Sequence, residues 1–308
     1  MKNVKIKWLI AHQPERLFLR TANAFANALQ KKKTNSMVEL EIHTMSTYTE
    51  KYGAPRDHLL NLLNDGEIQM TQTEVSAYGL WNRNFMVFDL PFLFRDHDHC
   101  TRVVEGKIGQ AMCQNLANNA NMRGLAFTYS GGYRVIGSNE PINSLEDLKN
   151  LRVLSSLANP ISQETLAALG AVATPHGGSN DNHGYAKIED GLADATETTY
   201  IRFQGKHVLK TNHSMFLTTI AINNEFYQGL DSDLQQAIAE AALEAGHLER
   251  QWSIDEAQEF EEKCIENGVS ITELSAAEMK EFRDSVMKVY DTWESQFPPG
   301  MIDHIRMQ

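Results

Sequence analysis

Two hydrophobic periods alternate along the first part of the chain. Val4, Ile6, Trp8 and Ile10 alternate with more polar residues, which is the period of a β-strand. Further on, apolar residues recur every three or four positions, which is the period of a helix that packs on one side. The predicted elements are a strand at 4–10, a helix at 18–29, a strand at 38–42, a helix at 59–63 and a strand at 68–71.

This order of strands and helices predicts an α/β fold with a largely parallel sheet. In such sheets ligands bind beyond the carboxyl ends of the strands. The residues that follow the first and third strands are therefore binding candidates, among them His12, Gln13 and Glu74. For Glu74 the competing interpretation is a solvated loop carboxylate.

The middle of the chain predicts a second set of strand and helix units. The run at 85–94 is almost wholly apolar, and Pro91 blocks a helix there, so we expect a buried extended segment. The other predicted elements are a helix at 101–119, a strand at 124–129, a strand at 151–154, a helix at 161–169 and a short helix at 185–189.

The C-terminal third is predominantly helical. Residues 231–264 contain no proline and are rich in Ala, Glu, Gln and Leu, which favours one long helix. At 1.5 Å per residue such a helix is about 50 Å long, so we expect it to run across two lobes. Ser275 and Glu278 have the spacing of a capping box and predict a further helix that continues toward Trp293.

Composition excludes several classes of function. The chain has 308 residues and a formal net charge of −12, which argues against binding to nucleic acid or to anionic lipid. No stretch approaches the length of apolar sequence that spans a membrane. The first residues are too short and too alternating for a signal peptide, so either the protein is cytosolic or a leader has been removed. The three cysteines, Cys100, Cys113 and Cys264, are expected to be free thiols, although a pair between the first two stays open.

No motif demands catalysis, a metal or a cofactor. The cluster at 97–100 (His-Asp-His-Cys) is the most metal-like, but adjacent ligands cannot all face one ion, and a polar helix start explains it as well. The glycine-rich run at 177–182 lacks the pattern of a phosphate loop. No Ser or Cys lies in a nucleophile motif. We therefore predict a protein that is not an enzyme.

Several single residues are candidates for contact with a ligand. Arg134 offers a planar, permanently charged fork that suits a carboxylate, and a salt bridge between lobes is the competing interpretation. Glu197 follows a predicted strand. Trp81 and Tyr200 could stack on a ligand, although lone aromatic residues more often belong to a core.

Five passages together resemble the DctP-type solute-binding proteins of tripartite ATP-independent periplasmic (TRAP) transporters. They are 59–72 (LLNLLNDGEIQMTQ), 87–94 (VFDLPFLF), 132–134 with 141–151 (PINSLEDLKNL), 185–197, and 211–213 (Thr-Asn-His). The resemblance covers nearly the whole chain. It implies a two-lobed periplasmic-binding-protein-like fold of type II, with hinge strands between the lobes and a long helix that spans both.

The resemblance also implies a division of the chain and a place for the ligand. Lobe I is expected to comprise 1–130 with 219–256, and lobe II to comprise 131–218 with 257–308. The solute would bind in the cleft between the lobes, which close on it. The resemblance implies a periplasmic protein that delivers its solute to a TRAP membrane permease. We expect it to be a monomer and not to insert into the membrane itself.

The family's site residues carry over one by one. The arginine of the family's G-x-R motif corresponds to Arg134, and a glutamate that ends the third strand corresponds to Glu74. The position of the family's main carboxylate-clamping arginine is Leu154 here, and Arg152 occupies a neighbouring lysine position. The asparagine of the family's D-G-x-E-N motif is Thr198, after Glu197.

These departures leave two ligand classes open. Arg152 could reach the cleft and hold an organic acid together with Arg134. Alternatively the ligand is not a simple carboxylate, and Leu154 contacts an apolar or cationic body with Glu74 as its counter-charge. We expect an organic acid. Two further alternatives are a ligand-binding module of a sensory or regulatory system, and a hydrolase or lyase that uses Glu74 or His12 as a base.

Overall fold

The computed structural model describes residues 2–176 and 187–308, which form two compact units. Unit 1 comprises Met1–Asn82, Thr101–Ser130 and Leu217–Trp252, and unit 2 comprises Arg83–Cys100, Gly131–Phe216 and Ser253–Gln308. The segment Arg83–Cys100 therefore belongs to unit 2, whereas the sequence placed it in lobe I. One reason is that the Tyr290 hydroxyl donates to the Pro91 carbonyl at 2.7 Å, within unit 2.

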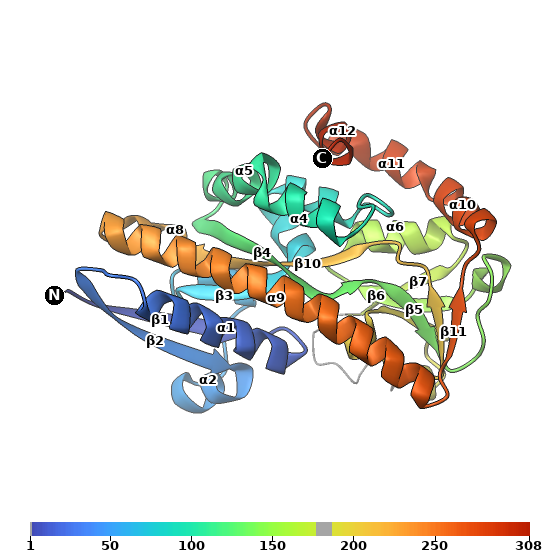
Figure 1. The fold of residues 1–308 in the computed structure, drawn as a ribbon, viewed down its shortest axis with the longest axis horizontal. Coiled ribbons are helices and arrows are strands. Elements are labelled where there is room, and N and C mark those ends of the chain that lie inside the picture. The colour runs from blue at the N-terminus through green and yellow to red at the C-terminus, as the bar shows by residue number, and fades with distance from the viewer. Residues whose placement is uncertain (1, 177–186) are drawn as a thin grey trace. The chain divides into compact units, whose positions relative to one another are not determined.

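Unit 1 is built on a five-stranded sheet in the order β2-β1-β3-β10-β4 (Figure 1). β1 pairs in parallel with β2 and β3, as the strand–helix order predicts, and β10 pairs antiparallel to β3. The strands and helices that begin in unit 1 are β1 (Lys2–Ile10), α1 (Glu15–Gln30), β2 (Ser36–Thr44), α2 (Met45–Tyr52), α3 (Leu59–Asn64), β3 (Met70–Glu74), η1 (Val75–Leu80), α5 (Lys107–Asn115), η3 (Leu116–Asn118), β4 (Met122–Tyr133), α8 (Asn224–Gln228) and α9 (Ser232–Glu266).

The core of unit 1 follows from the two predicted periods. The apolar side of β1 buries Ile6 and Trp8 completely, and α1 buries Phe18 and Phe25. The rings of Trp8 and Phe25 meet edge to face, with their centres 5.2 Å apart. The predicted strands and helices of this region are thus confirmed, because side chains spaced for one face of a strand and one face of a helix bury each other.

Unit 2 is built on a six-stranded sheet in the order β11-β9-β5-β8-β6-β7. β6 pairs in parallel with β7 and β8, whereas β5 pairs antiparallel to β8 and β9. The strands and helices that begin in unit 2 are η2 (Arg83–Asp89), α4 (His97–Glu105), β5 (Val135–Ser138), η4 (Glu146–Leu148), β6 (Arg152–Ser156), α6 (Pro160–Ala168), β7 (Val172–His176), β8 (Ala195–Thr198), η5 (Tyr200–Arg202), β9 (His207–Lys210), β10 (Met215–Asn223), β11 (Ser270–Glu273), α10 (Ala276–Ser285), α11 (Met287–Trp293), η6 (Glu294–Gln296) and α12 (Met301–Arg306).

The structure differs from the predicted elements in the middle of the chain at two places. The apolar run 85–94 is buried, but its first part is the 3₁₀ helix η2 and not an extended segment, because Pro91 constrains only the residues next to it. The single helix predicted at 101–119 is divided into α4, α5 and η3, with Gly106 in extended conformation between the first two. Only residues 187–189 of the helix predicted at 185–189 are described, and they are helical; the run 177–182 lies outside the described residues.

The long C-terminal helix is confirmed as α9, which has 35 residues. It passes from unit 1 to unit 2 after Trp252, and β4 and β10 also cross between the units. The capping box at Ser275 and Glu278 is formed as predicted, and it begins α10. The helix predicted to continue to Trp293 is interrupted at Val286, where α11 takes over.

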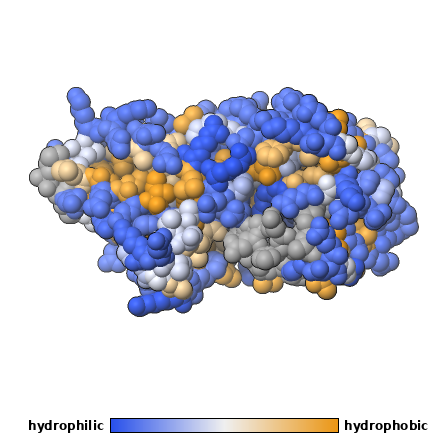
Figure 2. All heavy atoms as spheres, turned by 90° about the horizontal axis from the view of Figure 1, so that it is seen from below, coloured by the Kyte–Doolittle hydropathy of each residue, from blue (hydrophilic) through white to orange (hydrophobic). Residues whose placement is uncertain are grey.

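The three cysteines are free thiols, as expected from the sequence. Cys100 and Cys113 are buried free thiols, and Cys264 is a partly buried one. Figure 2 shows hydrophilic residues over most of one face, with apolar side chains gathered in separate areas. Within the described residues, no helix combines the length and the apolar character that crossing a bilayer requires.

A testable consequence concerns the close approach of α9 to β4 at Gly246. A Cβ atom there would lie 3.0 Å from the Ala126 Cβ and 3.2 Å from the Phe127 carbonyl oxygen. Gly246→Ala gains helix propensity, but we expect the crowding to outweigh it and to lower the free energy of unfolding by about 1 kcal/mol. Denaturant unfolding measures this change. The exposed Leu243→Ala on the same helix is the control, and a more stable Gly246→Ala protein would contradict this packing.

Candidate functional site

Arg134 is an almost fully buried cation in unit 2, with 4% of its surface exposed. It lies directly before β5, and its backbone N–H donates to the Ser214 carbonyl at 2.8 Å. The carbon of its guanidinium lies 3.8 Å from the centre of the Phe216 ring. A guanidinium plane stacks favourably on an aromatic face. These contacts fix both the position and the orientation of the side chain.

The partner of Arg134 is the buried carboxylate of Glu197 on β8. Nη1 of Arg134 lies 3.3 Å from Oε2 of Glu197, and both side chains are at most 5% exposed. The same Oε2 accepts a hydrogen bond from the Ser162 hydroxyl of α6 at 2.6 Å. Oε1 of Glu197 lies 2.9 Å from Nε2 of His213. Both carboxylate oxygens are thus satisfied, as a buried charge requires.

The pKa of Glu197 shows that this compensation is effective. Burial alone would raise the pKa, but the charge of Arg134 and the hydrogen bonds from His213 and Ser162 outweigh burial and lower the pKa to about 2. Glu197 is therefore ionised at neutral pH. The cluster of Arg134, Glu197, His213 and Ser162 is called the Arg134 cluster below.

His213 links the Arg134 cluster to the backbone around it. Its Nδ1 lies 2.7 Å from the Thr211 hydroxyl oxygen, and its carbonyl accepts a hydrogen bond from the backbone N–H of Phe92 at 2.6 Å. Phe92 has a φ angle of 55°, which is uncommon for a residue with a bulky side chain. The two ring nitrogens of His213 thus contact Thr211 and Glu197, which together orient the imidazole.

One edge of the Arg134 guanidinium has no partner within the described residues. Nη1 faces Glu197, whereas Nε is buried and makes no hydrogen bond there. Nε and Nη2 together form the side-on edge of a guanidinium, which binds a carboxylate through two parallel hydrogen bonds. A buried N–H donor without an acceptor is costly, so an acceptor from a ligand is the expected complement.

Arg152 lies at a different place in the same sheet. It begins β6, and its guanidinium bonds Asp194 through Nε at 2.9 Å and Nη2 at 2.6 Å, with a further bond from Nη1 to the Gly191 carbonyl at 2.8 Å. The strand registers place Arg152 at the amino end of β6 and Arg134 beside the carboxyl end of β8. Arg152 is level with Asp194 and Arg134 with Thr199, and five residues of strand correspond to about 16 Å. The structure therefore does not bring Arg152 together with Arg134.

Leu154 and Thr198 lie on the face of the unit 2 sheet opposite to Glu197. Leu154 is opposite Thr196 in the parallel register of β6 and β8, and successive strand residues alternate between faces. Leu154 is fully buried and Thr198 is 8% exposed. Neither side chain joins the Arg134 cluster.

Tyr200 belongs to an apolar cluster of unit 2. It is 5% exposed and packs with Val135 and Val208, against Phe203 and Phe260. Burial raises the pKa of its hydroxyl well above the ordinary value, and the neighbouring charge of Glu261 adds to the shift. This placement agrees with the core interpretation of an isolated aromatic residue.

The other predicted contacts lie in unit 1. The His12 ring is buried and meets Phe18 edge to face, with their centres 5.1 Å apart. The side-chain oxygen of Gln13 accepts a hydrogen bond from the first residue of α1. Glu74 is the last residue of β3, and Trp81 follows η1 directly. The predicted residues therefore form two sets, one in each unit, and Arg134 and Glu197 of the unit 2 set contact each other.

Ser162 and His213 of the Arg134 cluster, and Phe216, which stacks on Arg134, were not predicted as site residues. They come from α6, the loop before β10 and β10 itself, so no local spacing connects them. The passage 211–213 was noticed for its resemblance to the family, which is the one signal that pointed toward His213.

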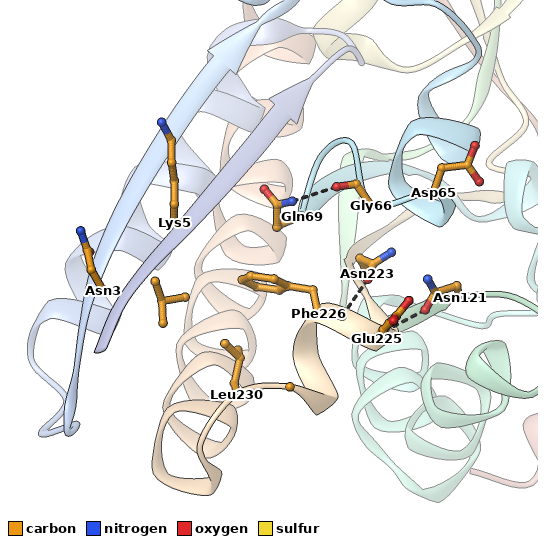
Figure 3. Close-up of a pocket in the computed structure, with 12 residues that line it drawn as sticks. Asn3, Lys5, Asp65, Gly66, Gln69, Asn121, Asn223, Glu225, Phe226 and Leu230 are labelled. Carbon is orange, nitrogen blue, oxygen red and sulfur yellow. Dashed lines mark hydrogen bonds between the residues drawn. The ribbon is translucent and has the colours of Figure 1, made fainter. Parts of the chain in front are cut away.

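A separate pocket of about 450 Å³ opens in unit 1 (Figure 3). Its polar groups satisfy one another: the Gln69 amide donates to the Gly66 carbonyl at 3.0 Å, and the Glu225 backbone N–H donates to the Asn121 side-chain oxygen at 2.8 Å. It contains none of the predicted contacts.

Two α/β units that share long strands and one long helix define the class of two-lobed periplasmic binding proteins. The chain matches the model of the DctP family, described as bacterial extracellular solute-binding protein, family 7, over residues 11–296. It therefore belongs to this family. The protein is a periplasmic solute-binding protein of the TRAP type.

Relatives in the family bind different solutes. The chain is 26% identical to the C4-dicarboxylate-binding periplasmic protein DctP of Rhodobacter capsulatus over 280 residues, which cover 88% of this chain and 78% of that protein. It is 25% identical to the ectoine-binding periplasmic protein TeaA of Halomonas elongata over 258 residues, covering 80% and 74%.

A solved structure has the same fold. The TRAP periplasmic solute-binding protein from Shewanella oneidensis with bound succinate matches with a TM-score of 0.86 at 20% identity, and the match covers 99% of both chains.

The Arg134 cluster predicts an acid-sensitive contribution to stability. The folded-state pKa of Glu197 lies below the ordinary 4.5, so this contribution is present above pH 4.5 and is lost as the pH falls toward about 2. Glu197→Gln removes one partner of a buried ion pair, and we expect it to lower the free energy of unfolding by about 3 kcal/mol at neutral pH.

Denaturant unfolding of both proteins at several pH values checks this expectation. The difference between wild type and Glu197→Gln should shrink as the pH falls through the range from 4.5 toward about 2. The exposed Glu281→Gln of the same unit is the control. A difference that does not vary with pH would show that the charge of Glu197 is not what stabilises the cluster.

Proposed function

We propose that the protein captures a small organic acid in the periplasm, holds its carboxylate on the side-on edge of Arg134, and delivers it unchanged to a TRAP permease. The observation that carries this proposal is the buried Nε of Arg134, which has no acceptor within the described residues. Family membership supports the role in capture and delivery. The succinate and C4-dicarboxylate named for the similar proteins are acids of the proposed class.

Arg134 is prepared for this role by its surroundings. Stacking on Phe216 and pairing with Glu197 fix the guanidinium before the ligand arrives, so little side-chain entropy is lost on binding. The bond to Glu197 uses Nη1 only, which leaves the bidentate edge for a carboxylate. Because the chain carries a net charge of −12, attraction of an anion must come from local groups such as this one.

Leu154 favours a second candidate, a ligand in which the carboxylate is not the main recognised group. The resemblance places a carboxylate-clamping arginine at this position, and Leu154 is fully buried. Without that arginine the protein has one guanidinium fewer for an acid. The ectoine named for the similar protein TeaA shows that solutes other than C4-dicarboxylates are named for similar proteins.

The protein is further proposed to act as a monomer and without turnover. Capture and release require that the solute leaves chemically unchanged, which separates this function from a hydrolase or lyase that uses Glu74 or His12 as a base. Size-exclusion chromatography with light scattering tests the oligomeric state. Mass spectrometry of the solute before and after incubation with the protein tests for turnover, and any new product would contradict the proposal.

The role of Arg134 is tested by comparing two arginines of the same unit. A thermal-shift screen of mono- and dicarboxylic acids first identifies a bound acid, because a ligand that binds the folded state raises the melting temperature. Arg134→Ala should lower the affinity for that acid by more than about tenfold, because a charge-assisted bidentate contact is lost. Isothermal titration calorimetry measures the change.

Arg152→Ala is the matched control, because Arg152 is already bonded to Asp194. We expect its affinity to stay within about threefold of wild type, a difference below that of a typical hydrogen bond. Equal losses in both variants, or no loss in Arg134→Ala, would contradict the assigned role of Arg134.

A further inference from the structure

Unit 1 contains a buried polar cluster that the proposed ligand contact does not use. The carboxyl group of Glu249 on α9 is fully buried, and its Oε2 lies 2.6 Å from the side-chain Nε2 of Gln72 on β3. The same Nε2 lies 2.7 Å from the Thr128 hydroxyl on β4 and 3.2 Å from the Thr218 hydroxyl on β10. The two threonine hydroxyls also bond each other. One amide and one carboxyl therefore join four elements.

These residues lie at the places where the chain leaves unit 1. The chain crosses between the units five times, and four of these crossings occur within an unbroken strand or helix. One falls after Cys100 on α4, and the others fall after Ser130 on β4, before Leu217 on β10 and after Trp252 on α9. Thr128, Thr218 and Glu249 lie within three residues of the crossings on β4, β10 and α9. The cluster thus bonds the unit 1 ends of three of the four continuous connections to one another.

The contact of α9 with β4 is close on both sides of Glu249. Three residues before it, a Cβ atom at Gly246 would crowd the Ala126 Cβ at 3.0 Å and the Phe127 carbonyl oxygen at 3.2 Å. Directly after it, Arg250 donates from Nη1 to the same Phe127 carbonyl at 2.6 Å and from Nη2 to Glu105. The helix is therefore held to the strand by packing, by a cation and by the carboxyl cluster.

Glu249 is surrounded by neutral groups apart from one cation. The side chains that act on it are Thr21 of α1, Gln72 and Thr128, and Arg250 of its own helix is the charged neighbour. Arg250 is already paired with Glu105. Burial raises the pKa of Glu249 to about 8, although the hydrogen bonds from Thr21, Gln72 and Thr128 and the charge of Arg250 oppose the shift. The carboxyl is therefore mainly protonated at neutral pH.

We propose that protonated Glu249 is a positioning residue that ties the unit 1 ends of β4, β10 and α9 into one joint, and that its ionisation loosens all three together. In two-lobed binding proteins the connecting segments absorb the change in lobe orientation. A joint that is rigid on the unit 1 side confines the bending of β4, β10 and α9 to the unit 2 side of their crossings. The proposal goes beyond the identity of the solute, and it stands whether or not the solute is an acid.

Hydrogen exchange of the full chain without ligand tests the joint. We compare wild type, Glu249→Gln, Glu249→Leu and the exposed control Glu244→Gln at about pH 6 and about pH 9, on either side of the expected titration. Rates are corrected for the intrinsic pH dependence of exchange. The peptides that report are those around Thr128, Thr218 and Glu249, and β1 of the same unit serves as the internal reference.

The expected result is a coordinated change in three segments. In wild type and Glu244→Gln, exchange around Thr128, Thr218 and Glu249 should accelerate by about tenfold or more between the two pH values, because local opening becomes linked to loss of the proton. Glu249→Gln keeps a neutral hydrogen-bonding side chain, so it should stay protected at both. Glu249→Leu should exchange fast in all three segments at both.

Three outcomes would overturn the proposal. The same acceleration in Glu249→Gln and wild type would assign the pH effect to another group. Loosening of one segment alone would show that the cluster does not act as a unit. Wild-type protection that does not change between the two pH values would contradict the role of ionisation, and this holds even if Glu249→Leu fails to fold. Carbon-13 NMR of the glutamate side chains supplies the titration directly, with a midpoint near 8 expected for Glu249.

Discussion

The burial of the Arg134 guanidinium is the constraint on which the site depends. A buried cation must be compensated, and Glu197 compensates it at 3.3 Å while Phe216 stacks on its plane. Glu197 in turn requires Ser162 and His213, which come from a helix and a loop far away in the sequence. The elements β5, β8, α6 and the start of β10 in unit 2 thus keep the Arg134 guanidinium in place. Within the described residues, the guanidinium edge that carries Nε has no acceptor, and this edge can bind a carboxylate through two hydrogen bonds.

Periodicity predicted the elements with simple amphipathic patterns, such as β1, α1 and α9. It did not predict the 3₁₀ helix in the apolar run 85–94. A run of almost only apolar residues has no hydrophobic periodicity that distinguishes a helix from an extended segment. Gly106 and Val286 divide predicted helices, since tertiary packing decides whether a helix continues across such positions. Five crossings between units likewise cannot be read from local patterns, which explains why Arg83–Cys100 was placed in the wrong lobe.

The candidate site was only partly predictable, and the reason is similar. Arg134 and Glu197 were identified by residue chemistry and by resemblance, and they do contact each other. Arg152 was a reasonable candidate from its position two residues before Leu154, but the strand register places it at the other end of the sheet, beside Asp194. A sequence motif does not show where along a strand a residue lies relative to residues of neighbouring strands, unless the register of the strand pairing is known. The buried environment of Glu249 was not predicted either, because a glutamate in an Ala-rich helix looks like a solvated residue.

Native mass spectrometry of the protein as purified from cells that grow on mixed carbon sources tests most directly whether Arg134 holds a small organic acid. The measurement detects a solute that travels with the folded chain and gives its mass, without a choice of probe. We expect wild type to retain a small organic acid and Arg134→Ala to lose it, while the variant keeps the charge-state distribution of the folded protein. A co-purified solute without a carboxylate, or an acid that Arg134→Ala retains as well as wild type does, would contradict it.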